Sequence, residues 1–359
     1  MSTLEERVRD AYRAADSWGP DVPPPLPAAP RPRRRVRVLA PLGAAVAVGA
    51  VVAGAVVAGV GEPERTPPGP VAPAATPYVL MTVSRGLSVV DSRTGLVPHA
   101  PVPPPEKAGG AKAAYNAVTR GAGAGEYLAS ISTLVRAPTR RTPPKSSSRV
   151  YRVTVTGDGR AEIGAPLDWT IPGVLREMAL SPDGRRLAYL RAMDEGPKLG
   201  VLDLASKRHR EWPVRTAGIP DTTKSLAWRA DGLEVVFTRR GTVRGLDPAT
   251  GRERTLVPAT KAPGGIDSAV PDADGLTVAV VNGKRVRLFQ YRGGRWSKPL
   301  VTIPGCGGVA MFTRAGDGRT LLLGRDAAAC SLPIRLYAVQ DGQVRRIFKS
   351  DGTFASVAW

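Results

Sequence analysis

The sequence predicts an all-β domain built from repeated units, and three observations point to it. From residue 78 to residue 359 the chain consists of short apolar and β-branched runs separated by Gly, Asp and Pro, without long helical periodicity. Several Asp-Gly pairs in that region lie between two apolar runs, as in a hairpin whose turn needs a glycine. Four such pairs recur at intervals of 48, 43 and 43 residues, at Asp183, Asp231, Asp274 and Asp317.

Each repeated unit contains the parts of a four-stranded sheet. A first strand such as "REMALS" precedes the Asp-Gly turn, and a second such as "RLAYLR" follows it. A third strand such as "LGVLDL" comes next, and a turn of the D-x-x-T-G type ("DPATG" from Asp247) leads to a short polar fourth strand. Four strands in about 40 to 50 residues, repeated along the chain, are typical of the blades of a β-propeller.

The repeats and the two ends of this region together predict six blades. Five units lie between about residue 112 and residue 350, the first of them long and interrupted by an insertion. "YVLMTV", "LSVVDS" and "GLVPHAPV" resemble second, third and fourth strands without a first, whereas "TFASVAW" resembles a first strand alone. We therefore expect the C-terminal strand to pair with the segment around Leu80 and to close the ring, because an open ring would leave a long unpaired edge.

The stretch "SPDGRRLAYLRA…LGVLDLASK", Ser181 to Lys207, resembles the repeat of TolB-like six-bladed propellers. In the other units only the Asp-Gly pair and the flanking apolar positions are similar. The units also resemble WD repeats. The resemblance covers residues 78–359 loosely and implies a ring scaffold with loops around a central channel. It implies partner binding more often than catalysis, although the fold also hosts enzymes.

An apolar segment, residues 38–60, precedes this domain and predicts one transmembrane helix. It has 23 residues without a charge, which at helical rise span roughly 35 Å, enough for a hydrocarbon core of about 30 Å. Five arginines lie in residues 31–37, so the positive-inside rule places the N-terminus in the cytoplasm and the propeller outside. A cleavable signal peptide is the alternative; the 37-residue leader and the length of the apolar run favour an uncleaved anchor.

The sequence thus divides into four parts. Residues 1–37 form a cytoplasmic segment, with a short amphipathic helix expected over residues 2–18 and a Pro/Arg-rich spacer after it. Residues 38–60 are the transmembrane helix, residues 61–77 a proline-rich extended linker, and residues 78–359 the extracytoplasmic propeller. The first helix is too short to be stable alone in water, so a cytoplasmic protein is a candidate partner for its apolar face.

The composition argues against several classes of function. The formal net charge of +20 suggests nucleic acid, but the excess arginine is spread along an Arg-, Ala-, Gly- and Pro-rich chain, so we expect no nucleic-acid partner. Two histidines and two cysteines are too few for common zinc sites, and we expect no metal or other cofactor. The sequence contains no G-x-S-x-G, G-x-x-x-x-G-K or H-E-x-x-H motif, and we expect no catalytic residues.

Two sets of residues are candidate sites. Cys306 and Cys330 are the only cysteines and fall in one unit, so in an oxidising space they predict a structural disulfide. The insertion "RAPTRRTPPKSSSR" has five basic residues and no acid, so it is a candidate site for an anionic polymer or lipid headgroup; a solvated loop explains the composition equally well. Its basic residues are Arg136, Arg140, Arg141, Lys145 and Arg149.

Two functions from different classes remain open. The first is a membrane-anchored, non-enzymatic propeller that binds a protein or cell-envelope ligand outside the cytoplasm, as a scaffold or a sensor. The layout of a short N-terminal helix, one span and an outer domain resembles membrane-bound anti-sigma regulators, without their zinc-binding motif. The alternative is an extracytoplasmic lyase or hydrolase, which predicts acidic and basic side chains gathered at one mouth of the channel.

Overall fold

The structure is a computed structural model, and it describes residues 77–83, 85–105, 112–135, 145–192, 196–214, 223–283, 285–304, 309–314, 320–325, 334–350 and 354–359. The expected cytoplasmic helix, transmembrane helix and most of the proline-rich linker lie outside these residues. Within them, no helix has the length and apolar character needed to cross a membrane.

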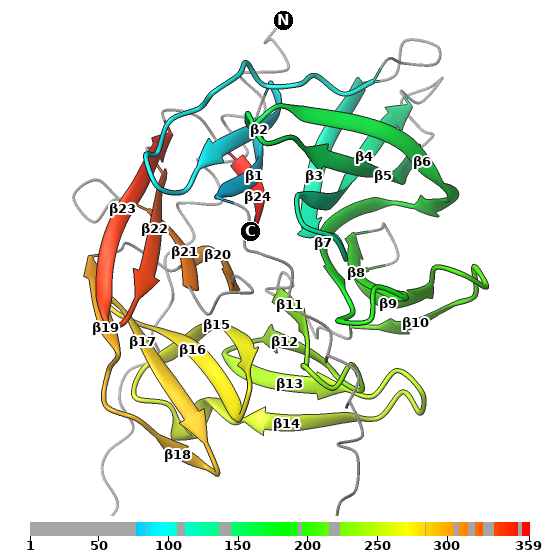
Figure 1. Cartoon of the computed structure of the whole chain (residues 1–359). Coiled ribbons are helices and arrows are strands. Elements are labelled where there is room, and N and C mark those ends of the chain that lie inside the picture. The colour runs from blue at the N-terminus through cyan, green and yellow to red at the C-terminus, as the bar shows by residue number, and fades with distance from the viewer. Residues whose placement is uncertain are drawn as a thin grey trace, which may run out of the picture. The chain divides into compact units, whose positions relative to one another are not determined.

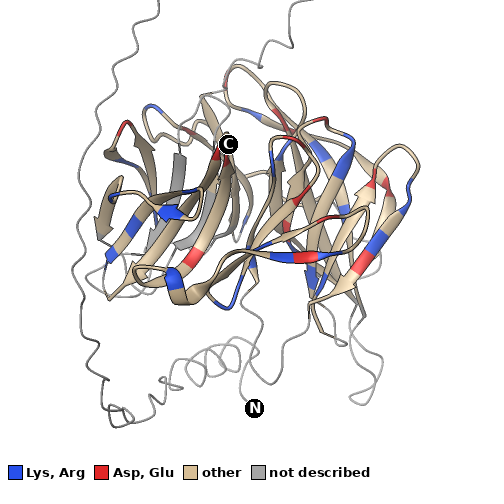
Figure 2. Ribbon diagram, turned by 90° about the horizontal axis from the view of Figure 1, so that it is seen from below, with Lys and Arg blue, Asp and Glu red and all other residues tan. Residues whose placement is uncertain are grey.

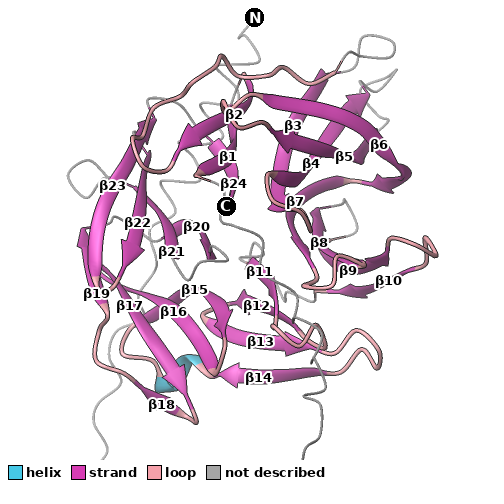
Figure 3. Ribbon diagram, in the orientation of Figure 1, coloured by secondary structure: helices cyan, strands magenta, loops and turns pink. Residues whose placement is uncertain are grey.

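The described residues form an all-β propeller of six antiparallel sheets (Figures 1 and 3). The first sheet along the chain that is complete contains β3 (Lys112–Arg120), β4 (Glu126–Val135), β5 (Lys145–Val155) and β6 (Ala161–Pro172). The second contains β7 (Val174–Leu180), β8 (Arg186–Ala192), β9 (Lys198–Asp203) and β10 (His209–Pro213). The third contains β11 (Lys224–Trp228), β12 (Val235–Arg239), β13 (Thr242–Leu246) and β14 (Glu253–Val257).

The other three sheets continue the ring. After a short 3-10 helix, η1 (Ala259–Lys261), the fourth contains β15 (Gly265–Asp272), β16 (Gly275–Asn282), β17 (Arg285–Arg292), β18 (Arg295–Trp296) and β19 (Val301–Pro304). The fifth contains β20 (Val309–Arg314), β21 (Thr320–Arg325), β22 (Ile334–Gln340) and β23 (Gln343–Ser350). The sixth, which we call the closing sheet, contains β1 (Tyr78–Val83), β2 (Gly86–Asp91) and β24 (Phe354–Ala358).

The innermost strands β3, β7, β11, β15, β20 and β24 surround the middle of the ring (Figure 1). Every one of them has a register shift of one residue against its neighbouring strand, for example between Tyr115 and Ala117 in β3 and between Leu175 and Glu177 in β7. Such β-bulges bend a strand and leave a backbone group without its ladder partner. Serine hydroxyls replace two of these partners, since Ser130 Oγ accepts the Ala117 N–H at 3.0 Å and Ser148 Oγ the Leu175 N–H at 3.1 Å.

The hydrophobic core is divided among the interfaces between neighbouring sheets. Six clusters of buried side chains each join two adjacent sheets around the ring. One of them, for instance, packs Leu190 and Leu199 of the β7–β10 sheet against Phe237 and Leu246 of the β11–β14 sheet. Each fully buried Leu or Phe contributes roughly 1.5–3 kcal/mol relative to exposure, so the sheets are held face to face by burial of this kind.

The predicted closure of the ring is confirmed. β24 pairs with β1 in antiparallel register, Leu80 opposite Ala358, and Trp359 is only 3% exposed. Ser356 of β24 also joins the following sheet, because its hydroxyl oxygen accepts the N–H of Val118 at 2.9 Å.

The prediction of six four-stranded blades needs correction, because five of the sheets have four or five strands and the closing sheet has three. The expected fourth strand, "GLVPHAPV", makes a single bridge, between Val102 and Leu87. Pro98 and Pro101 interrupt this stretch and Pro103 follows it, and proline has no N–H to donate to a sheet. The chain therefore passes the outer edge of β2 without forming a ladder.

Candidate functional site: a basic groove

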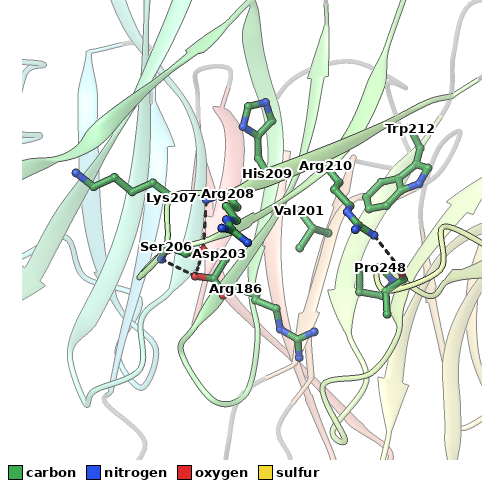
Figure 4. Close-up of a pocket in the computed structure, with 11 residues that line it drawn as sticks. Arg186, Val201, Asp203, Ser206, Lys207, Arg208, His209, Arg210, Trp212 and Pro248 are labelled. Carbon is green, nitrogen blue, oxygen red and sulfur yellow. Dashed lines mark hydrogen bonds between the residues drawn. The ribbon is translucent and has the colours of Figure 1, made fainter.

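A groove of about 520 Å³ lies at the outer end of the β7–β10 sheet (Figure 4). Its walls are the turn between β9 and β10 and, from the next sheet, the turn between β13 and β14. The basic residues that line it are Arg186, Lys207, Arg208 and Arg210, next to His209. Trp212 and Pro248 add apolar surface, and Asp203 is the one acidic residue among those that line it. We call this hollow the basic groove.

The turn after β9 presents two of the basic residues. Asp203 Oδ1 accepts the N–H groups of Ala205 and Ser206, at 3.2 and 2.7 Å, and the Ser206 hydroxyl at 2.8 Å. The hydrogen bond from the Ser206 N–H is the main cause that lowers the pKa of the Asp203 carboxyl. Lys207 completes the turn with a positive φ of 58°, and Lys207 and Arg208 then lie exposed at its tip.

The opposite wall is the D-x-x-T-G turn that starts at Asp247. Its carboxylate accepts the Ala249 N–H at 2.8 Å and the Thr250 hydroxyl at 2.7 Å, as the sequence pattern predicts for this turn. Gly251 ends the turn with φ of 76°, and a Cβ there would lie 2.5 Å from Trp212 Nε1. Arg210 Nη1 crosses the groove and donates to the carbonyl oxygen of Ala249 at 2.9 Å.

The groove has a net positive charge because four Lys and Arg side chains and one carboxylate, Asp203, line it. The Asp203 carboxylate accepts the hydrogen bonds of its own turn. Lys207 Nζ lies 2.5 Å from Asp168 Oδ2, but the two side chains are 56% and 89% exposed, and ion pairs at such exposure contribute little. Arg208 has no acidic partner among the described residues. A carboxylate or phosphate in the groove would therefore meet guanidinium and ammonium donors that are still available.

A buried polar network fixes the strand that carries the groove. Arg191 on β8, 5% exposed, donates from Nε and Nη2 to the two carboxylate oxygens of Glu211 on β10, at 2.7 and 2.5 Å. Its Nη1 reaches the Pro172 carbonyl oxygen at 2.9 Å, and the Tyr189 hydroxyl donates to Glu211 at 2.8 Å. Burial alone raises the pKa of Glu211, but the bonds from Arg191 and Tyr189 outweigh it and lower the pKa. Glu211 is therefore ionised, and hydrogen bonds from Arg191 and Tyr189 fix its position on β10.

Charged side chains also meet at the centre of the ring. Glu177 on β7 accepts the Leu226 N–H at 2.8 Å, and Lys224 on β11 forms an ion pair with Asp267 on β15. Burial raises the pKa of Glu177 to about 7. The enzyme alternative predicts such a gathering, but Glu177 accepts a backbone N–H and Lys224 pairs with Asp267, and these contacts join three innermost strands. Among the described residues, no group of three or more His, Cys, Asp or Glu is placed to hold a metal.

The structure does not place most of the residues that the sequence singled out. Cys306, Cys330, Arg136, Arg140 and Arg141 lie outside the described residues, so the disulfide and the anionic-partner loop stay predictions.

The predicted end of that loop, at Arg149, was wrong because β5 begins at Lys145. Lys145 and Arg149 belong to β5, whose polar start, "KSSS", pairs with β4 from Val135 to Ser132. Arg149 is exposed, and its Nε lies 3.4 Å from Thr170 Oγ1 of β6. The hydroxyls of Ser147 and Ser148 hydrogen-bond to Thr133 and Ser132 of β4, at 3.1 and 2.6 Å, so low hydrophobicity did not prevent the strand.

Sequence reasoning missed the basic groove, although a signal was present. The stretch "SKRHRE", Ser206 to Glu211, places four Lys, Arg and His residues in succession at a hairpin. In a chain with excess arginine throughout, this run did not stand out. The other wall comes from residues about 40 positions later, and only the packing of two sheets brings them together.

Comparisons with known proteins support the fold and nothing finer. The sequence matches no model of a known protein family and none of the curated proteins. Among solved structures, a chain of the nidogen/laminin complex is similar over 78% of this chain and 97% of its own, with a TM-score of 0.51 and 12% identity. A putative TolB from Agrobacterium tumefaciens is similar over 78% and 91%, with a TM-score of 0.48 and 15% identity. TolB from Acinetobacter baumannii is similar over 79% of this chain and 82% of its own, with a TM-score of 0.44 and 16% identity.

Proposed function

We propose that this chain is a membrane-anchored, non-enzymatic β-propeller that binds an acidic segment of a protein partner outside the cytoplasm. The observation that carries the proposal is the basic groove, where Lys207, Arg208 and Arg210 line one hollow and Asp203 is the one acidic residue among those that line it. An open groove with fork-shaped donors and some apolar surface suits the carboxylates of an extended peptide. The apolar segment at residues 38–60 and its arginine flank support the anchor.

The proposal also covers the N-terminal stretch and the number of blades. The amphipathic stretch at residues 2–18 would contact a cytoplasmic protein, so that binding outside could be reported inside, as in a membrane-bound regulator. We also count the closing sheet as a sixth blade. Its innermost strand has the same bulge as those of the other five sheets, and one hydrophobic cluster joins it to each of its two neighbours.

Binding of a fluorescent acidic peptide to the purified full chain tests the groove. A Glu-rich octapeptide is expected to bind with an affinity that falls as salt rises. Lys207→Gln/Arg208→Gln is expected to weaken binding by tenfold or more, because it removes two available donors without disturbing the buried network below. Arg346→Gln/Lys349→Gln removes the same charge from a distant sheet and should bind as the unchanged chain does. Equal loss in both variants, or no binding at all, would contradict the proposed groove.

A further inference from the structure

Positive charge is concentrated in the last two complete sheets. Residues 285–350 contain twelve Lys and Arg but only three Asp and Glu. Elsewhere in the ring many basic side chains have acidic partners, such as Arg239 with Glu253 at 2.7 Å and Arg254 with Glu234 at 2.6 Å. Basic and acidic residues are interspersed on several strands in Figure 2. By contrast, none of the basic residues on β23 has an ion pair with an acid in the part of the chain that the structure describes.

The hairpin of β22 and β23 presents these charges together, and we call it the basic hairpin. β23 is the outermost strand of its sheet, and Arg345, Arg346 and Lys349 on it are exposed. Lys349 lies opposite Arg335 of β22 in the ladder. Arg346 and Lys349 thus place exposed positive charge along the outer edge of this sheet.

The basic hairpin lies beside the point where the proline-rich linker enters the propeller. The carbonyl oxygen of Pro77 accepts the Ser92 N–H at 2.6 Å. The carbonyl oxygens of Ser92 and Arg93 in turn accept Nη2 and Nη1 of Arg345, both at 2.6 Å. Figure 1 shows the segment after β2 running alongside β23. Two successive hydrogen-bond contacts therefore connect the end of the linker to the basic hairpin.

From this placement we propose that the basic hairpin is a membrane-facing surface that binds the anionic headgroups of the bilayer in which the chain is anchored. The inference rests on the proposed anchor at residues 38–60. A linker of 17 residues in extended polyproline form reaches about 50 Å, and it enters the ring at the basic hairpin. Basic groups within a Debye length of anionic lipid, about 8–10 Å, are attracted to it. Contact there would leave the basic groove, which lies on a different sheet, available to a protein.

Hydrogen–deuterium exchange of the full chain in lipid nanodiscs tests the proposal. In discs that contain phosphatidylglycerol, the backbone amides of residues 343–350 are expected to exchange several-fold more slowly than in phosphatidylcholine discs. High salt should abolish the difference, because the attraction is electrostatic. Arg346→Gln/Lys349→Gln should abolish it too and leaves the Arg345 contacts intact. Lys207→Gln/Arg208→Gln is the charge-matched control and should keep it, and β14 should exchange equally in both discs.

Three results would overturn the proposal. One is equal exchange of residues 343–350 in both kinds of disc. The second is protection that the Arg346→Gln/Lys349→Gln variant retains, since it would not come from these charges. The third is a chain that does not stay in the discs, because the propeller would then have no bilayer beside it. Protection by added soluble polyphosphate without protection by anionic lipid would assign the surface to a polymer instead. Failure of peptide binding in the groove leaves all of these readouts unchanged, so the two proposals are separable.

Discussion

At the scale of single residues, Glu177 shows how the centre of the ring makes a carboxyl group sensitive to pH. Burial raises its pKa to about 7 from an ordinary value of 4.5, although the Leu226 N–H and the charge of Lys224 favour the anion. Asp267, which pairs with Lys224, opposes the anion. Between the two pKa values the folded chain therefore holds a proton that the unfolded chain has released.

This difference predicts the direction of the pH dependence of stability. Because the folded-state pKa is the higher one, the contribution of Glu177 is fully present below about pH 4.5 and is lost as pH rises through 7. Glu177→Gln keeps an acceptor for the Leu226 N–H but has no proton to release. The midpoint of thermal unfolding of the unchanged chain should fall between pH 5 and pH 8 by several degrees more than that of Glu177→Gln, measured by circular dichroism. If the midpoints of the two chains changed equally with pH, Glu177 would titrate as a solvent-exposed carboxyl does.

Individual turn residues show what sequence reasoning could and could not supply. Gly184 and Gly232 have positive φ, 70° and 68°, as the Asp-Gly hairpin pattern predicts. Gly275 instead begins β16, and a Cβ there would lie 2.4 Å from the Tyr291 carbonyl oxygen, so this glycine is needed for close approach of another strand. An Asp-Gly pair thus supplies either a residue with positive φ or room for a neighbouring strand, and only the packing shows which.

At the scale of the element, β10 depends on charges that it shares with β8. Arg191 and Glu211 are hydrogen-bonded to each other, with side chains 6% and 17% exposed, and Tyr189 adds a third contact. Removing one partner of a buried pair leaves the other charge uncompensated, at a cost of about 3–5 kcal/mol, whereas apolar replacement of both is often tolerated. The position of the basic groove is therefore tied to this pair.

We predict that Arg191→Met destabilises the chain more than the double variant Arg191→Met/Glu211→Leu does. The single variant leaves the Glu211 carboxylate without its guanidinium, and the double variant removes that buried charge. The free energy of unfolding from urea titrations of both variants, with the unchanged chain as reference, measures the difference. A double variant that is less stable than the single one would mean that Glu211 is solvated in the folded state.

Element boundaries followed the sequence where turns are encoded locally. The strands on either side of "SPDG" and "DPATG" lie where the pattern predicts, because Asp, Thr and Gly make the turn from neighbouring residues. The start of β5 and the missing fourth strand beside β2 were both predicted wrongly. In the first case tertiary pairing outweighed a polar composition, and in the second a series of prolines outweighed favourable apolar residues.

At the scale of the whole molecule, the ring depends on pairing between distant parts of the chain. Ser356 lies opposite Thr82, 274 positions earlier, and Val357 and Trp359 pack into the cluster that joins the closing sheet to the β20–β23 sheet. Internal repeats predicted this closure, because a first strand was missing at one end and present at the other. The surfaces that a partner would use could not be predicted in the same way, since they combine side chains from separate sheets.

Removal of residues 352–359 is predicted to prevent formation of a monomeric propeller. β1 would lose its inner neighbour, and the exposed edge would favour pairing with other chains. Trp359→Ala keeps the strand and removes the buried indole ring, so the variant should fold with a stability lower by about 3–5 kcal/mol. Size-exclusion chromatography and thermal unfolding of the two variants distinguish these outcomes. A shortened chain that remains monomeric and cooperative would show that the pairing of β24 is dispensable.

The same pairing brings the two ends of the propeller next to each other. Because Leu80 and Ala358 are neighbours in one sheet, a short connection from residue 359 to residue 77 would turn the closing sheet into a continuous one. New ends could then be opened at a solvent-exposed turn such as that between β17 and β18, where Gly293 and Gly294 have open space around them. A circularly permuted form would thus carry its ends on the β15–β19 sheet, and the chain termini would no longer lie beside the basic hairpin.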